Sequence, residues 1–338
     1  MSKPLVLITG ATGHIGFRTL VFALQAGYRA RVSSRKLAQA EALRHAESIK
    51  PYLDSIEFVE VPDFLADGAF DEAVRDVDYI LHLASPIPTP ELAADVKRHI
   101  LDPAIKGTVG MLQSAAKSKS VKRVVVTSSV VILEPKPGNS TAGPYDLTAI
   151  PDADKVPADE WIAYRASKRL AYHAAEDFMA SKKPTFDLVN ILPSYVQGRN
   201  ELVTRKEDVH NGSNDVMMDL VLGAKGDRPR KANTVFVDDV AKVEVLALDP
   251  KLAKNGDNFI AAGSPSGMSI EWNDVTQIVG KLFPDAVKSG ILPLGGDQES
   301  ISVNYDVSKT EEAFGFKFAG LETQVKSLIG QYVELASK

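Results

Sequence analysis

The sequence predicts an α/β fold, a doubly wound parallel β-sheet with a smaller lobe built from C-terminal segments. Short, continuously apolar runs such as residues 4–9 are typical of strands buried on both faces of a parallel sheet. These runs alternate with amphipathic helical patterns along the first 190 residues. A glycine-rich turn joins the first run to the first helix, which is the point where such sheets bind ligands.

The order of elements follows from this alternation. Strands are expected at residues 4–9, 28–32, 56–61, 77–83, 122–128 and 186–191. Helices are expected after the first glycine turn, over residues 37–49, 69–75 and 91–117, and around Tyr164 after a Pro/Gly-rich loop at 134–157. Pro103 should break or kink the helix at 91–117, because proline lacks the N–H that an α-helix needs.

The first turn has the spacing Gly-x-x-Gly-x-x-Gly. Glycine permits a tight turn, a close approach to a pyrophosphate and close helix–strand packing. The helix that follows offers its N-terminal N–H groups to phosphates. We expect the cofactor to contact Gly10, Ala11, Thr12, Gly13, His14, Ile15 and Gly16, with His14 as a turn residue near the phosphates. An ordinary glycine-rich turn is the alternative.

The end of the second strand indicates which dinucleotide binds. NAD-preferring sites usually carry an acid there, and no acid occurs between Tyr28 and Gln39. Arg35 and Lys36 instead supply positive charge for a 2′-phosphate, which arginine can engage through two hydrogen bonds. The pattern predicts NADPH as cofactor, the alternative being basic residues on a solvated helix start.

The pair Tyr164 and Lys168 carries the predicted chemistry. Residues four apart lie on one face of a helix, so a phenol stands beside an ammonium that favours its ionised form. Ser129, just past the fifth strand, is placed to hydrogen-bond a substrate oxygen. Alternatively, the pair is a chance solvated one and the serine satisfies nearby backbone.

Composition excludes several classes of function. The chain has 338 residues, a net charge of −5 and no cysteine, so we expect no nucleic-acid partner, disulfide or thiol catalysis. Six histidines show no metal-ligand spacing, so no metal site is expected. No apolar run approaches the ~20 residues of a membrane span. The first strand starts four residues from Met1, and we expect a cytoplasmic protein without a signal peptide.

The ordered motifs resemble the extended short-chain dehydrogenase/reductase superfamily, and within it the branch of dihydroflavonol reductase-like and yeast methylglyoxal (ketone) reductase-like enzymes. They are residues 10–16, 63–64, 82–86, 102–108, 126–129, 164–168, 190–198 and 235–241. The resemblance implies that Ser129, Tyr164 and Lys168 form a catalytic triad. It also implies cofactor contacts for Asp63, Phe64, Ala84, Ser85, Pro86, Pro193, Val196 and Ser213. One departure is that Ala104 stands about where the superfamily has a fourth catalytic residue, an asparagine.

Together these features predict an NADPH-dependent reductase that converts a ketone or aldehyde to an alcohol, working as a monomer or homodimer. A nucleotide-sugar epimerase or dehydratase and a non-catalytic NADPH-binding regulator remain alternatives. Residues 1–190, with 235–262 returning, should form the dinucleotide-binding domain, and residues 191–234 and 263–338 the substrate lobe. Several apolar residues are expected around the substrate, and together they predict a mostly apolar small molecule, although each alone could equally fill the core. They are Ile87, Val131, Leu133, Trp161, Tyr195, Met217, Met218 and Val221.

Overall fold

A computed structural model describes residues 3–86, 89–263 and 266–338, and it divides the chain into two compact units. The first unit comprises Met1–Glu134, Tyr145–Leu192 and Ala241–Phe259, and the second comprises Pro135–Pro144, Pro193–Val240 and Ile260–Lys338. The sequence assigned residues 235–240 to the dinucleotide-binding part, whereas here they belong to the second unit. The reason is that β10 (Thr234–Phe236) pairs with β8 (Tyr195–Gln197) instead of joining the large sheet.

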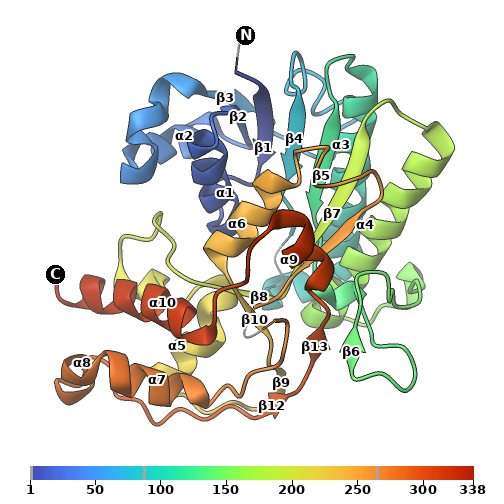
Figure 1. The fold of residues 1–338 in the computed structure, drawn as a ribbon. Helices are drawn as coiled ribbons and strands as arrows, with labels where there is room; N and C mark the ends of the chain where they lie inside the picture. The colour runs from blue at the N-terminus through green and yellow to red at the C-terminus, as the bar shows by residue number, and fades with distance from the viewer. Residues whose placement is uncertain (1–2, 87–88, 264–265) are drawn as a thin grey trace. The chain divides into compact units, whose positions relative to one another are not determined.

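The large sheet has seven strands in the order β11-β7-β5-β4-β1-β2-β3 (Figure 1). Its strands are β1 (Leu5–Thr9), β2 (Arg29–Ser34), β3 (Ile56–Glu60), β4 (Tyr79–His82), β5 (Arg123–Thr127), β7 (Asp187–Pro193) and β11 (Asn258–Ala261). The pairs from β3 through β7 are parallel. From β1 the chain adds β2 and β3 in one direction, and from β4 it adds β5, β7 and β11 in the other. The doubly wound sheet predicted from the sequence is therefore confirmed.

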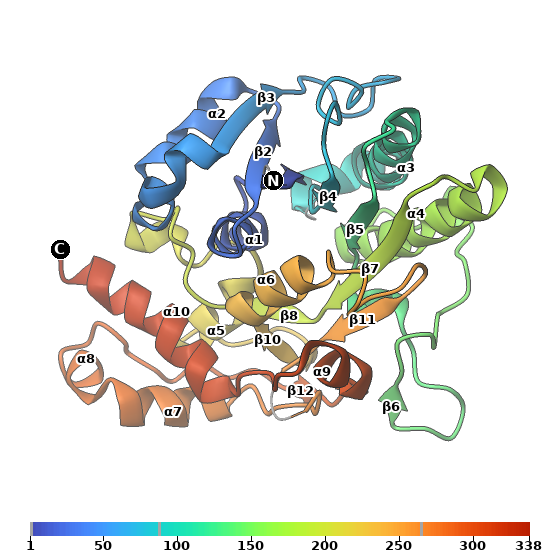
Figure 2. The ribbon, with the colours of Figure 1, turned by 45° about the horizontal axis from the view of Figure 1, so that its top comes forward.

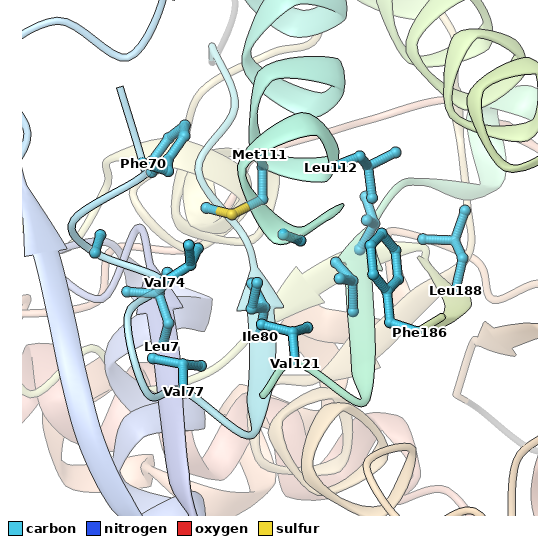
Figure 3. Packing of buried hydrophobic residues seen from close by; sticks show 14 of the residues in the cluster. Leu7, Phe70, Val74, Val77, Ile80, Met111, Leu112, Val121, Phe186 and Leu188 are labelled. Atoms are coloured by element: carbon cyan, nitrogen blue, oxygen red, sulfur yellow. The ribbon is translucent and has the colours of Figure 1, made fainter. Parts of the chain in front are cut away.

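Helices α3 (Asp102–Lys117) and α4 (Glu160–Lys182) pack against each other and cover one face of this sheet. Met111 and Leu112 of α3 point toward strand residues such as Ile80 in the buried cluster of Figure 3. Leu5 and Leu7 of β1 belong to the same cluster. Val6 and Ile8 therefore face the opposite side, because side chains alternate along a strand. These apolar contacts on both faces explain the continuously apolar strand sequences.

Three of the expected helices differ in the structure. Residues 69–75 form only consecutive turns, which bury Phe70 against the α3 face of the sheet. Helix α2 (Leu37–Glu41) ends early, and two 3₁₀ segments continue the chain to Ser55. The segment before α3 is a π-helix (Lys97–Leu101), and Pro103 lies in the first turn of α3. Proline fits there because first-turn N–H groups have no partner within an α-helix.

The remaining elements can be followed in Figures 1 and 2. The helices are α1 (His14–Gln25), α5 (Asp215–Val221), α6 (Val237–Leu246), α7 (Asp274–Leu282), α8 (Pro284–Lys288), α9 (Ser308–Phe314) and α10 (Leu321–Ala336). Two further two-stranded pairs join β6 (Thr141–Ala142) to β13 (Asn304–Tyr305) and β9 (Arg230–Lys231) to β12 (Ser300–Ile301). Within the described residues, no helix has the length and apolarity required to cross a bilayer.

Candidate active site

The glycine turn after β1 forms a tight cradle of bare backbone. Gly10 has a φ of +75°, and the Gly13 N–H donates to the Gly10 carbonyl at 2.9 Å. A Cβ added to Gly10 would lie 2.9 Å from the Ala84 nitrogen, and one added to Gly16 would lie 2.1 Å from the Gly10 oxygen. Helix α1 begins at His14 without a side-chain cap or an acidic first turn, so its N-terminus can face an anion. The residues present therefore fit a dinucleotide pyrophosphate.

The register of the sheet brings the other predicted loops of the first unit to the same edge. Thr9 of β1 pairs with His82 of β4, which pairs with Val126 of β5. The segments that follow these residues begin at Gly10, at Leu83 and at Thr127, so they leave the sheet side by side. The Thr9 hydroxyl accepts a hydrogen bond from the Ala84 N–H at 3.1 Å, which ties the β4 loop to β1. Ser85 and Pro86 follow directly and are half-buried.

The residues predicted to bind the adenosine half follow β2 and β3. Arg35 and Lys36 are both exposed immediately after β2, where a 2′-phosphate can reach them. Asp63 is exposed, and its carboxylate accepts from the Leu65 N–H at 2.8 Å, which fixes the turn. Phe64 is half-buried and packs edge-on against Phe70, with ring centroids 5.0 Å apart. Part of the surface of the Phe64 ring is therefore already in contact with the core.

Helix α4 carries Tyr164 and Lys168 on one face. The Asp159 carboxylate caps the helix by accepting from the Ile162 N–H at 2.7 Å. The Lys168 ammonium nitrogen lies 5.9 Å from the centre of the Tyr164 ring, one turn earlier. Ser129 begins a short 3₁₀ turn, Val130–Ile132, which packs against α4. The structure therefore brings the helix with the Tyr–Lys pair next to the turn that starts with Ser129.

Lys168 is buried, and its ammonium donates to the Thr127 carbonyl at 3.1 Å. Burial lowers the pKa of Lys168 to about 8, and the charge of Glu244 partly opposes this shift. Glu244 of α6 is fully buried, and its Oε1 accepts from the Thr127 hydroxyl at 2.5 Å. Burial raises the pKa of Glu244 to about 8, while the Thr127 hydrogen bond and the Lys168 charge act in the opposite direction.

His82 is a buried neutral histidine beside this group. Its Nδ1 lies 3.0 Å from the Thr9 hydroxyl, which already accepts from the Ala84 N–H. The Thr9 hydroxyl and Nδ1 of His82 thus share a hydrogen bond. Burial lowers the pKa of His82 to about 4, and the Lys168 charge adds to the effect. His82 and Lys168 line a cavity of about 20 Å³, enough for roughly one water.

The other predicted cofactor residues belong to the second unit. Pro193 ends β7, Val196 lies on β8, and the Ser213 hydroxyl donates to the Val196 carbonyl at 2.6 Å. The predicted pocket residues Met217, Met218 and Val221 are fully buried with Trp272 in the core of this unit. Ile87, another predicted pocket residue, lies outside the described residues.

Two residues of the site were not assigned from the sequence. Glu244 interrupts an apolar stretch between Val243 and Val245, and an acid inside a buried helix pattern is the signal that could have identified it. Thr127, the last residue of β5, is the second of these residues, and it contacts both Lys168 and Glu244. No group of three or more acidic or histidine side chains able to hold a metal occurs among the described residues.

The sheet and its glycine cradle define a Rossmann-like α/β protein of the short-chain dehydrogenase/reductase type. The NAD dependent epimerase/dehydratase family pattern matches residues 6–262, so this chain belongs to that family and the predicted resemblance is confirmed.

Known proteins of similar sequence and structure match this chain over nearly its whole length. Ketoreductase CTB6 of Cercospora beticola is 40% identical, with 100% of this chain and 97% of that protein covered. Ketoreductase sphI of Aspergillus fumigatus is 33% identical, with 100% of each chain covered. The crystal structure of Gre2 from Candida albicans in complex with NADPH superposes with a TM-score of 0.81 at 25% identity, covering 98% of this chain and 99% of that one.

Proposed function

We propose that this protein is an NADPH-dependent reductase that converts a ketone or aldehyde to an alcohol. The observation that carries the proposal is the buried Lys168 ammonium, held at the end of β5 one helical turn after Tyr164 and beside the turn that begins with Ser129. The similarity to two ketoreductases and to an NADPH complex of Gre2 supports the same chemistry.

In this proposal, each residue has a defined task. Ser129 donates a hydrogen bond to the carbonyl oxygen, where negative charge develops during reduction. Tyr164 gives its phenolic proton to that oxygen, and the Lys168 ammonium stabilises the charge left on the phenol. NADPH supplies the hydride when it is bound. The glycine cradle and the α1 N-terminus hold the pyrophosphate, and Arg35 and Lys36 hold the 2′-phosphate.

The alternatives on this scaffold are less well supported. Dehydratases of the superfamily typically place an acid pair directly after the fifth strand, whereas here Ser129 precedes the apolar turn Val130–Ile132. A regulator that only binds NADPH would not need Lys168 buried beside Tyr164. We further propose a small, mostly apolar carbonyl substrate and a cytoplasmic location. For the oligomeric state, a monomer or a homodimer stays the prediction.

The substitution Tyr164→Phe tests the proposed chemistry. NADPH absorbance is followed over a panel of ketones and aldehydes, and NADPH affinity is measured by fluorescence titration. We expect kcat to fall by about 10²–10⁴-fold, as on loss of a general acid, with NADPH affinity retained. Tyr79→Phe is the matched control, because Tyr79 is the first residue of β4, at the end of the strand away from the candidate site. Near-normal turnover of Tyr164→Phe would remove Tyr164 from the mechanism.

A further inference from the structure

The carboxyl group of Glu244 has no task in the chemistry proposed above, yet one residue connects it to Lys168. The Thr127 side chain donates its hydroxyl proton to Glu244 Oε1 at 2.5 Å. The backbone carbonyl of the same Thr127 accepts from the Lys168 ammonium at 3.1 Å. Thr127 is thus held on one side by the carboxyl group and on the other by the ammonium.

A carboxyl group in this position is costly unless something compensates it. Glu244 is 0% exposed, and within the described part of the chain no donor lies within hydrogen-bond distance of its Oε2. The compensating charge is Lys168, itself buried. Burial works against both charges, whereas each charge stabilises the other. Each group therefore supports the ionised form of the other, and because the pKa of Glu244 is raised to about 8, its charge acts on Lys168 from about pH 8 upward.

The other groups that face Lys168 do not supply the negative charge that stabilises its ammonium form. His82 approaches from β4 and is neutral at working pH, because burial holds its pKa low. The Tyr164 ring approaches from α4 itself and carries no charge while the phenol is protonated. Thr127 supplies a carbonyl dipole from β5. Glu244 is the acidic group whose charge acts on the Lys168 ammonium.

We propose that Glu244 is a positioning residue that acts through Thr127 to keep Lys168 in place and, at alkaline pH, in its ammonium form. This proposal rests on the proposed reductase function for its kinetic consequence, although its electrostatic basis does not. At alkaline pH, where the Glu244 carboxyl is ionised, its removal would leave the buried ammonium without its opposing charge. Lys168 would then lose its proton at a lower pH.

The substitution Glu244→Gln tests this directly, since it keeps the shape and an oxygen for the Thr127 hydroxyl but removes the charge. We expect the alkaline limb of kcat/KM against pH to move about 1–3 pH units lower, the usual effect of losing an opposite charge nearby. Activity at lower pH should be largely retained. A purely structural role of Glu244 would instead lower activity equally at every pH. Glu176→Gln is the matched control, because Glu176 is a half-buried acid two turns further along α4 that contacts Asn190.

A second measurement does not depend on activity. Protein without cofactor, labelled with ¹³C at the lysine ε-carbon, is titrated by NMR, and Lys168→Met identifies the Lys168 signal. We expect the titration midpoint of Lys168 to fall in Glu244→Gln and to stay unchanged in Glu176→Gln. An unchanged midpoint in Glu244→Gln would overturn the proposal. If the wild-type protein reduces no carbonyl compound, the proposed function fails while this titration still decides the role of Glu244.

Thr127 provides a further variant if Glu244→Gln does not fold. Thr127→Val keeps the side-chain shape and removes the hydroxyl that reaches Glu244, whereas Thr127→Ser retains it. We expect Thr127→Val to shift the titration midpoint of Lys168, and Thr127→Ser to keep this midpoint at the wild-type value. Equal midpoints for Val and Ser at this position would contradict an action through Thr127.

Discussion

At the scale of single residues, His82 makes stability depend on pH. Its pKa is lowered to about 4 by burial first and by the Lys168 charge second, whereas an unfolded histidine titrates near 6.5. Between these values the unfolded chain binds more protons than the folded one. The contribution of neutral His82 is therefore complete above about pH 6.5 and is lost as the pH falls through this window toward about 4.

We predict that His82→Gln removes this dependence. The free energy of unfolding should be measured by denaturant titration of both proteins from pH 4 to 7. The difference between wild type and variant should grow by about 3 kcal/mol from pH 4 to 6.5, as follows from the pKa shift. Glu244 opposes this trend in the wild type, because its raised pKa makes the folded state bind more protons. Since both proteins contain Glu244, the difference isolates His82. Parallel stability curves would contradict the prediction.

Arg35 is predicted to select the cofactor. The side chain is exposed at the end of β2, and charge-assisted hydrogen bonds of this kind are worth about 1.5–3 kcal/mol. Arg35→Ala should lower kcat/KM for NADPH about 10- to 150-fold and change that for NADH little. Arg29→Ala is the control, because Arg29 begins the same strand at its other end. Equal kcat/KM for the two cofactors in the wild-type protein would refute the predicted preference.

At the scale of elements, the contact between the glycine turn, α1 and the β4 loop leaves no room for a side chain. A Cβ at Gly16 would lie 2.1 Å from the Gly10 oxygen, so backbone atoms would have to move. We predict that Gly16→Ala destabilises the protein by about 1–3 kcal/mol, as overpacking does, and weakens NADPH binding. Thermal denaturation and a fluorescence titration with NADPH measure the two effects.

The control for this substitution lies in α3. A Cβ at Gly110 would meet nothing within 4 Å, and alanine favours a helix over glycine by about 1 kcal/mol. Gly110→Ala should therefore stabilise the protein slightly and leave NADPH binding unchanged. If both variants behaved alike, the close approach in the glycine turn would not be the cause.

The same elements show where periodicity predicts local structure and where it fails. The strand and helix around the glycine turn, β1 and α1, were predicted because their apolar residues and glycines act locally. Residues 69–75 were wrongly expected to be helical. Phe70 and Val74 of that segment are buried in one cluster with Leu7, Met111 and other residues distant in sequence, and turns satisfy this packing. Tertiary contacts override weak helical preference in so short a segment.

At the scale of the whole molecule, the chain returns to earlier elements in ways that spacing does not reveal. Residues 241–259 join the first unit, and through them Glu244 reaches Thr127 more than one hundred residues earlier. Residues 235–240 belong to the second unit instead, since β10 pairs with β8. Pairing partners of such short strands depend on the three-dimensional path of the chain, and neither strand has an apolar pattern long enough to specify its neighbour.

The sequence by itself determined the doubly wound sheet, the glycine cradle and the placement of Tyr164 and Lys168 on one helical face. Each of these depends on residues close together in the chain, whose spacing fixes which side chains share a turn or a face. Only the tertiary structure decided that Lys168, His82 and Glu244 are buried together around Thr127. Burial depends on segments that arrive from distant parts of the chain, and burial is what shifts the pKa of each of these groups.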